Sequence, residues 1–100
     1  MLTNKQIAYL KGLANKEKSV LQIGKDGLND TLRQNVRNYL NKHELIKINE
    51  LDTNPNSDEE VIEFFTKAGI EFVEHKGKTY VFYMHSEDAK NPIVLPKKTK

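Results

Sequence analysis

The chain has 100 residues, of which 37% are hydrophobic and 30% are charged, and its formal net charge is +2. This composition supports one modest core, so neither wholesale disorder nor a multidomain protein is expected. The absence of cysteine excludes a disulfide scaffold, a thiol nucleophile and a thiolate metal site.

The apolar runs are short and the charge is uneven. The longest apolar run, 80–84, cannot span a bilayer, and the N-terminus has no stretch that suits a signal peptide. We therefore expect a cytoplasmic protein with no membrane contact, and nothing in the sequence requires more than a monomer. Residues 1–50 carry nine Lys and Arg against five Asp and Glu, whereas residues 51–100 carry seven against nine. A basic half suggests a polyanion-binding face, although ordinary surface charge explains it equally well.

The first predicted elements are a helix and a strand. Thr3 and Gln6 have the spacing of a capping box, which predicts a helix start. Apolar residues then recur at helical spacing until about residues 15–18. The segment 19–23 is short and mostly apolar, which predicts a buried strand.

Two further helices follow, with a strand between them. Asn29 is placed to cap the second helix, which its apolar spacing extends to about Lys42. Residues 45–51 alternate as a strand does. Ser57 and Glu60 form a second capping box, and Gly69 is placed to end the third helix in a left-handed conformation.

The last predicted elements are two strands, 70–74 and 78–84, joined by a tight hairpin at Lys76-Gly77. The element order is α-β-α-β-α-β-β. Its β-α-β units imply parallel strand pairs, and the hairpin adds an antiparallel pair. We therefore expect an α/β fold with a four-stranded mixed sheet packed against helices. A single domain over 1–96 and a basic tail at 97–100 complete the expected organisation.

Catalytic motifs find little support. A P-loop would need glycine at position 19 and Ser or Thr after Lys25, where the chain has Ser19 and Asp26. No nucleophile elbow occurs, and the three histidines show no ligand spacing with each other or with carboxylates. We expect no catalytic residue, no metal and no cofactor.

The most informative segment is Gly24-Lys25-Asp26-Gly27, which connects a predicted strand to a predicted helix. Asp-Gly alone indicates a hairpin turn, but the period that follows is helical. Two glycines let the backbone approach a ligand closely, the helix N-terminus favours an anion, and Lys25 adds a full positive charge. A GXXG loop of this kind clamps a nucleic-acid backbone in KH domains. We therefore predict phosphodiester binding at residues 24–27.

Other basic residues could extend the binding surface. For each alone, a solvated surface charge is the simpler interpretation, but together they predict a basic patch. The candidates are Lys5, Lys11, Lys16, Lys18, Arg33, Arg37 and Lys47. Aromatic stacking is another common way to hold RNA. The four phenylalanines are expected in the core, while Tyr9 and Tyr39 are left open between core and surface.

Several segments together resemble a known family. They are the opening Leu2-Thr3 with Gln6 and Tyr9-Leu10, the run 20–28, the run His43-Glu44-Leu45-Ile46-Lys47, and the closing Asn91-Pro92 with Leu95-Pro96. In order and spacing they resemble the CRM domain (chloroplast RNA splicing and ribosome maturation) over nearly the whole chain. The similarity is greatest to the stand-alone bacterial form, the YhbY-like RNA-binding proteins.

The resemblance implies a fold similar to the C-terminal domain of translation initiation factor three. It implies RNA binding at Gly24, Lys25, Asp26 and Gly27, with Lys47 as a weaker candidate. For the stand-alone form it also implies binding to ribosomal RNA in precursors of the large (50S) subunit. Many family members have a small or neutral residue where this chain has Asp26, and a carboxylate beside a phosphate opposes binding.

Three hypotheses follow. The leading one is a non-catalytic RNA-binding protein of large-subunit assembly, and it predicts that Gly27→Asp weakens RNA binding while leaving the fold largely intact. The alternative is a ribosome-associated protein-interaction module without direct RNA clamping. An enzyme is the third.

Overall fold

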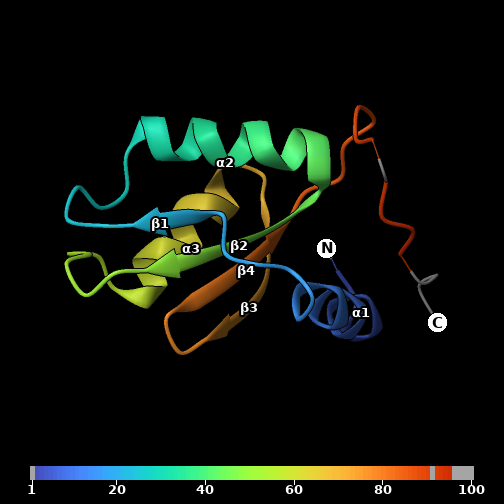
Figure 1. Ribbon diagram of the computed structural model, residues 1–100, viewed down its shortest axis with the longest axis horizontal. Coiled ribbons are helices and arrows are strands. Elements are labelled where there is room, and N and C mark those ends of the chain that lie inside the picture. Colours follow the sequence, from blue (N-terminus) through green and yellow to red (C-terminus); the bar gives the residue numbers. More distant parts are fainter. Residues whose placement is uncertain (1, 91, 96–100) are drawn as a thin grey trace.

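The computed structural model describes residues 2–90 and 92–95, so the basic tail expected at 97–100 lies outside the described residues. The element order matches the expected one (Figure 1). The elements are α1 (Asn4–Ala14), β1 (Leu21–Ile23), α2 (Asp30–His43), β2 (Leu45–Glu50), α3 (Asp58–Lys67), β3 (Glu71–Lys76) and β4 (Thr79–Tyr83).

Polar side chains start the three helices where the sequence predicts. Both capping boxes form, one at the start of α1 and one at the start of α3. Oδ1 of Asn29 accepts a 2.8 Å hydrogen bond from the Leu32 N–H and caps α2. Gly69 follows α3 with φ of 84°, as expected for a residue that ends a helix in the left-handed region.

The sheet is mixed, with strand order β1-β2-β4-β3. β1 and β2 are parallel, with Leu21 opposite Ile48, and both pairs that involve β4 are antiparallel. The second β-α-β unit does not form the parallel pair that was expected. β4 lies between β2 and β3, because the hairpin folds β4 back into the middle of the sheet.

Two local predictions were wrong. The strand predicted at 19–23 covers Leu21–Ile23 and lies at the sheet edge. Only Ile23 is fully buried, and Val20 is 43% exposed, because an edge strand is covered less completely than a central one. The hairpin turn is Gly77-Lys78, since β3 continues to Lys76, which pairs with Thr79. Gly77 has φ of 60°, which suits a two-residue hairpin turn.

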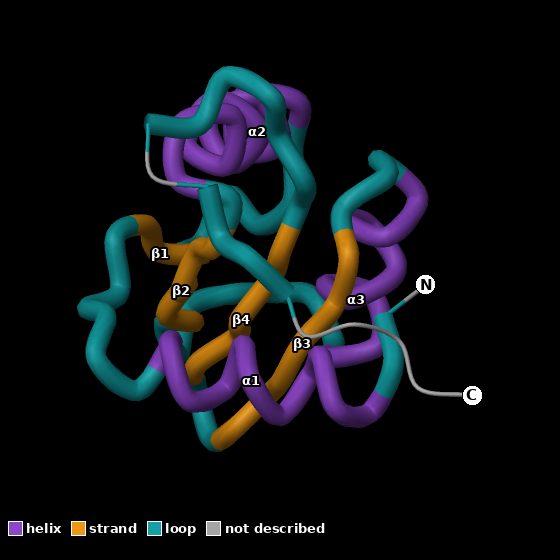
Figure 2. Tube along the Cα trace, turned by 90° about the vertical axis from the view of Figure 1, so that its right-hand side faces the viewer, coloured by secondary structure: helices purple, strands orange, loops and turns teal. Residues whose placement is uncertain are grey.

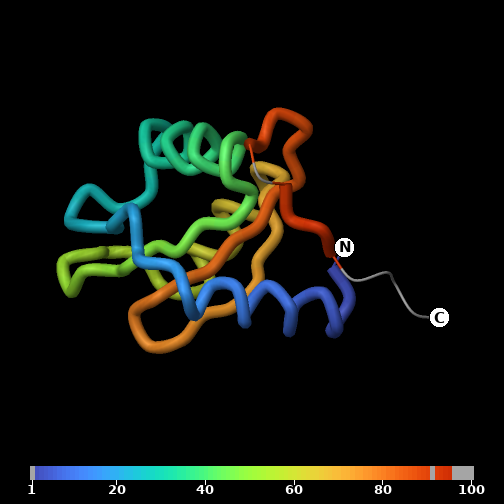
Figure 3. Tube along the Cα trace, turned by 45° about the vertical axis from the view of Figure 1, so that its right-hand side comes forward, coloured from blue at the N-terminus to red at the C-terminus, as the bar shows by residue number. Residues whose placement is uncertain are grey.

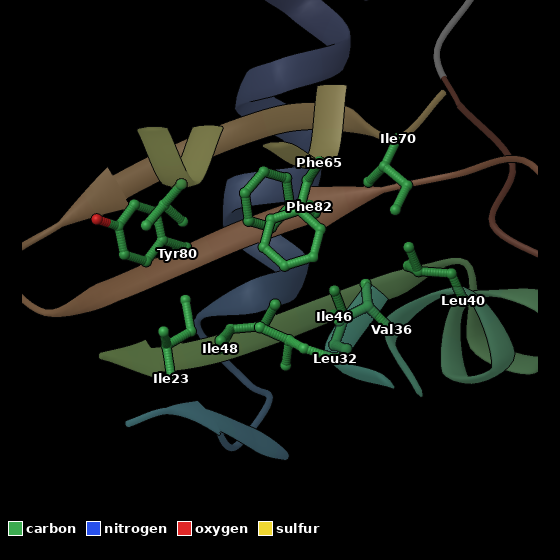
Figure 4. Packing of buried hydrophobic residues seen from close by; sticks show 11 residues of the cluster. Ile23, Leu32, Val36, Leu40, Ile46, Ile48, Phe65, Ile70, Tyr80 and Phe82 are labelled. Carbon is green, nitrogen blue, oxygen red and sulfur yellow. The ribbon is translucent and has the colours of Figure 1, made fainter. Parts of the chain in front are cut away.

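Hydrophobic clusters cover both faces of the sheet. One is formed by the sheet with α2 and α3, and Figure 4 shows the Phe65 and Phe82 rings at its centre, 4.8 Å apart. The other lies between the sheet and α1. Figure 2 shows α1 and α2 on either side of the strands. Residues of β4 alternate between the clusters, because successive strand residues point to opposite faces. Tyr80 and Phe82 join the first, and Val81 and Tyr83 the second.

The C-terminal segment is anchored at the junction of α2 and β2. Glu44 occupies this junction with φ of 63° and no exposed surface. Its carboxylate accepts hydrogen bonds from the N–H groups of Ser86 (2.6 Å) and Ile93 (2.7 Å). From there the chain runs back toward the start of α1, as Figure 3 shows. The His43–Lys47 motif therefore contains a carboxylate that holds Ser86 and Ile93 in place.

Candidate functional site

The loop 24–27 is a tight turn between the end of β1 and the start of α2. The Gly27 N–H donates a 2.9 Å hydrogen bond to the Gly24 carbonyl, which closes the turn. Gly27 is buried with φ of 62°, a conformation that favours glycine. Lys25 and Asp26 are exposed at the tip of the turn. The loop thus presents its two central residues to solvent and keeps its last glycine against the protein.

The backbone N–H groups of the loop divide into two kinds. Those of Gly27 and Leu28 are occupied, the latter by a 3.1 Å hydrogen bond to Oδ1 of Asn56. Those of Lys25 and Asp26 make no hydrogen bond within the described residues. Exposed, unpaired N–H groups are suitable donors for an anionic oxygen.

The first turn of α2 adds further donors. Asn29 caps the Leu32 N–H, while the N–H groups of Asp30 and Thr31 have no partner in the described part of the chain. The helix dipole places partial positive charge at the same point. Within the described residues, the loop and the helix N-terminus together offer several unpaired backbone donors close to one another in sequence.

A hollow of about 410 Å³ lies beside these donors. It is bounded by the loop, the β1 edge and the first turns of α2, at the left end of α2 in Figure 1. Most of its side chains are polar and several are uncharged. They include Gln22, Asn29, Thr31 and Asn35, all exposed. Uncharged donors and acceptors of this kind suit a polar ligand such as a nucleotide.

The side-chain charges near the loop nearly balance. Lys25 is exposed and makes no ion pair within the described residues, but Asp26 follows it directly. Asp30, in the first turn of α2, pairs with Arg33. The loop is therefore distinguished by unpaired backbone donors and one free ammonium group rather than by a large positive charge.

The remaining predicted cations do not gather around the loop. α1 carries Lys5 and Lys11 and packs on the sheet face opposite α2. Lys11 lies 4.0 Å from a carboxylate oxygen of Glu74. Lys16 and Lys18 are exposed in the connection from α1 to β1. The apolar spacing of α1 places Lys5 and Lys11 on its polar side, but it does not show on which face of the sheet the helix packs.

Lys47 and the two arginines have partners within the fold. Nζ of Lys47 donates to the carbonyls of Ala14 and Glu17, both at 3.4 Å, where α1 ends. Arg33 lies over the Phe64 ring at 5.2 Å, and Arg37 donates to the Ala68 carbonyl at 3.5 Å. Both arginines therefore face α3. The single basic patch expected from the sequence is divided into separate groups.

Comparison with known proteins decides the family. The model of the CRS1 / YhbY (CRM) domain matches residues 2–84, which is most of the chain. The chain belongs to the CRS1 / YhbY (CRM) domain family.

Relatives of this CRM domain match over 97% or more of their length. The Probable RNA-binding protein YqeI of Bacillus subtilis is 33% identical over 96% of this chain and 100% of its own. A Haemophilus influenzae protein named RNA-binding protein is 36% identical over 97% of both chains. The solution structure of SAV1595 from Staphylococcus aureus superimposes with a TM-score of 0.78 at 35% identity. It covers 96% of this chain and all of that one. The α/β fold expected from the sequence is confirmed.

The CRM domain also contains a polar cluster that the sequence did not reveal. Ligand atoms of Glu50, Asp58 and His75 lie within 4.8 Å of one another. The Tyr80 hydroxyl donates to Asp58 at 2.7 Å, and the Asn54 amide donates to Glu50 at 2.7 Å. These internal hydrogen bonds account for both carboxylates. His75 Nδ1 and Asp58 Oδ2 are 3.8 Å apart, wider than the roughly 3.4 Å between neighbouring ligand atoms around tetrahedral zinc. We assign no metal to this cluster.

Two residues that support the loop were also missed. Pro55 and Asn56, in the connection from β2 to α3, pack against Gly27. Asn56 binds the Leu28 N–H, so it fixes the point where the loop enters α2. The only signal in the sequence was that residues 52–56 form a loop, and no spacing rule relates that loop to residues 24–27.

Among the described residues, no helix has the length and apolar character needed to cross a membrane.

Proposed function

We propose that this CRM domain is a non-catalytic RNA-binding protein that holds RNA backbone at loop 24–27 and the first turn of α2. The observation that carries the proposal is that the exposed residues Lys25 and Asp26 have N–H groups without a partner in the described residues, beside an open polar hollow. The names of two relatives, which describe RNA-binding proteins, support it.

In this mechanism a phosphate oxygen accepts hydrogen bonds from the loop N–H groups. The Lys25 ammonium group neutralises part of the phosphate charge, and the dipole of α2 contributes in the same direction. Contacts of this kind fix the position of the protein on the RNA but carry little sequence information. Asp26 opposes the contact, so the affinity is lower than a neutral residue would allow.

We propose that the RNA is ribosomal RNA in precursors of the large (50S) subunit, and that the protein acts there as a cytoplasmic monomer with one domain over 1–96. The resemblance to stand-alone bacterial YhbY-like proteins supports this. The chain matches two relatives over 97% or more of their length.

The direct test compares wild type, Lys25→Glu and Lys76→Glu for affinity to a single-stranded RNA oligonucleotide. Lys76 is also exposed but lies on β3, the opposite edge strand of the sheet, so it controls for net charge. We expect Lys25→Glu to weaken binding several-fold more than Lys76→Glu. For about three to five neutralised phosphates, the log–log salt slope for wild type should be roughly −2 to −4. Equal effects of the two variants, or a slope near zero, would contradict the proposal.

The ribosomal target needs a separate experiment. Lysates with wild type or Lys25→Glu are sedimented through a sucrose gradient, with circular dichroism to verify folding. We expect wild type to travel with large-subunit precursors and the variant to remain near the top. If the variant still travels with the particle but has lost affinity for free RNA, the protein is an interaction module instead. If wild type stays at the top, the ribosomal target is wrong.

A further inference from the structure

A second hollow lies near the C-terminal end of α2, away from loop 24–27. It has a volume of about 300 Å³ and is bounded by the end of α1, the last turns of α2 and the C-terminal segment. Its apolar residues are Leu13, Leu45 and Ile93. Its polar residues include two aromatic rings and two lysines. The hollow therefore combines apolar side chains, aromatic rings and positive charge.

The rings belong to Tyr39 and His43, one helical turn apart on α2. Their centroids are 4.3 Å apart and their planes are inclined by 30°. Tyr39 is half-buried against the core, whereas His43 is exposed. The sequence did not decide whether Tyr39 lies in the core or on the surface. In the structure it packs against the core and is partly exposed. A base can stack on exposed rings whatever its identity, because every base has a π-face.

The positive charge comes from Lys42 and Lys90. A 3.3 Å hydrogen bond from the Lys90 N–H to the Lys42 carbonyl joins their backbones, and both side chains are exposed. Neither makes an ion pair within the described residues. Glu17 lines the same hollow but lies between the exposed Lys16 and Lys18 in sequence. The lining of the hollow therefore contains two lysines and one carboxylate.

We propose that this hollow is a second subsite for the same RNA, and that it takes one unpaired nucleotide. Its base stacks on the face of the exposed His43 ring that Tyr39 leaves uncovered, and its phosphate lies at Lys42 and Lys90. The inference rests on the proposed function, because loop 24–27 holds the strand elsewhere. It makes Lys16 and Lys18 part of the RNA path without requiring the lysines of α1 on the opposite sheet face.

The separation of the two subsites sets the length of RNA required. α2 has 14 residues. At about 1.5 Å per residue its ends are roughly 21 Å apart. A stacked strand advances about 3.4 Å per nucleotide, so roughly six nucleotides reach from the loop to the rings. A stacked tetranucleotide is too short to occupy both subsites, whereas a stacked dodecanucleotide is long enough.

The test measures affinities for tetraadenylate and dodecaadenylate with wild type, His43→Ala, the double variant Lys42→Glu/Lys90→Glu, Lys25→Glu and Lys76→Glu. These side chains are all exposed, so each variant should fold, and circular dichroism verifies it. We expect His43→Ala to weaken dodecaadenylate binding about five-fold or more, in line with the loss of a stacked base. It should change tetraadenylate binding less than two-fold. The double lysine variant should show the same length dependence, and Lys76→Glu should not.

The outcomes separate the two proposals. Suppose that Lys25→Glu weakens binding of both oligonucleotides, while His43→Ala and Lys42→Glu/Lys90→Glu change the binding of neither. The loop proposal then stands and the second subsite is wrong. The same conclusion follows if the variants of the hollow weaken binding of tetraadenylate and dodecaadenylate equally. If wild type binds neither oligonucleotide, the proposed function fails and the second subsite fails with it.

Discussion

Gly27 and Asn56 are packed so closely that a Cβ atom on Gly27 would lie 2.4 Å from Oδ1 of Asn56. Asn56 is not free to move away, because that oxygen accepts the Leu28 N–H that precedes α2. The backbone of Gly27 also lies in the left-handed region. This geometry opposes the expectation that Gly27→Asp would leave the fold largely intact. Loss of RNA binding in that variant would not separate a damaged loop from a lost contact.

A pair of alanine variants separates the roles of the two loop glycines. Gly27→Ala should lower the free energy of unfolding by about 1–3 kcal/mol, because it combines left-handed strain with the Asn56 contact. At Gly24 an added Cβ would make an ordinary 3.5 Å contact with Leu51, and Gly24→Ala should change stability by less than about 1 kcal/mol. Urea denaturation of both variants measures this. Equal stability of the two would contradict the geometry of the turn.

Removing the charge of Asp26 should improve RNA binding. Asp26→Asn keeps the shape of the side chain but removes a carboxylate beside the proposed phosphate. An exposed charge of this kind contributes roughly 0.2–1 kcal/mol, so the affinity should rise by about 1.4- to 5-fold. Fluorescence anisotropy at low and high salt provides the measurement, and the gain should shrink as salt rises. Glu87→Gln, another exposed acid, is the matched control. An equal gain in both variants would show only a net-charge effect.

Glu44 should be essential for the C-terminal segment. Glu44→Gln replaces a buried carboxylate by an amide that cannot accept from Ser86 and Ile93 with both terminal atoms. The loss of a charge-assisted hydrogen bond should cost about 1.5–3 kcal/mol of stability. Relative to wild type, the variant should show faster hydrogen exchange of the Ser86 and Ile93 amides, while the core amides in β4 change less. Unchanged protection of those two amides would contradict the assigned role of Glu44.

High pH should destabilise the fold through its buried tyrosines. Burial, and next the hydrogen bond to Asp58, raise the pKa of Tyr80, and burial also raises the pKa of Tyr83 and Tyr39. The folded state therefore holds these protons more tightly than the unfolded chain, where a tyrosine ionises near pH 10. This contribution to stability is complete below pH 10 and is lost as the pH rises toward the folded-state values.

Urea midpoints between about pH 8 and 12 should accordingly fall with increasing pH. Tyr80→Phe should be less stable near neutral pH, because it removes the hydrogen bond to Asp58, but its alkaline decline should be shallower. A wild-type stability that stays constant above pH 10, or an equal slope in the variant, would contradict the assignment.

Local patterns predicted most of the fold, and contacts between distant segments account for what they missed. The caps at Thr3, Asn29 and Ser57 form as expected, because a capping box involves only four neighbouring residues. The insertion of β4 between β2 and β3 could not be deduced, since a β-α-β pattern fixes strand direction and not adjacency.

The same limit applies to the candidate site. The GXXG spacing located the turn, since its own residues close it. Whether a cation is free or has a partner depends on which element packs next to it. Arg33 and Arg37 face α3 through Phe64 and Ala68, residues about 31 positions away. Nothing in a single sequence reports such pairs.

The most direct test of RNA binding at the loop is an NMR titration of the folded protein with single-stranded RNA, followed through backbone amide shifts. We expect the largest and saturable shifts at Lys25 and Asp26, with smaller ones at Asp30 and Thr31. Amides of α1 should be nearly unchanged. If the strongest shifts fall on α1 and the loop amides are unchanged, RNA binds to the opposite face of the sheet, which would contradict binding at loop 24–27.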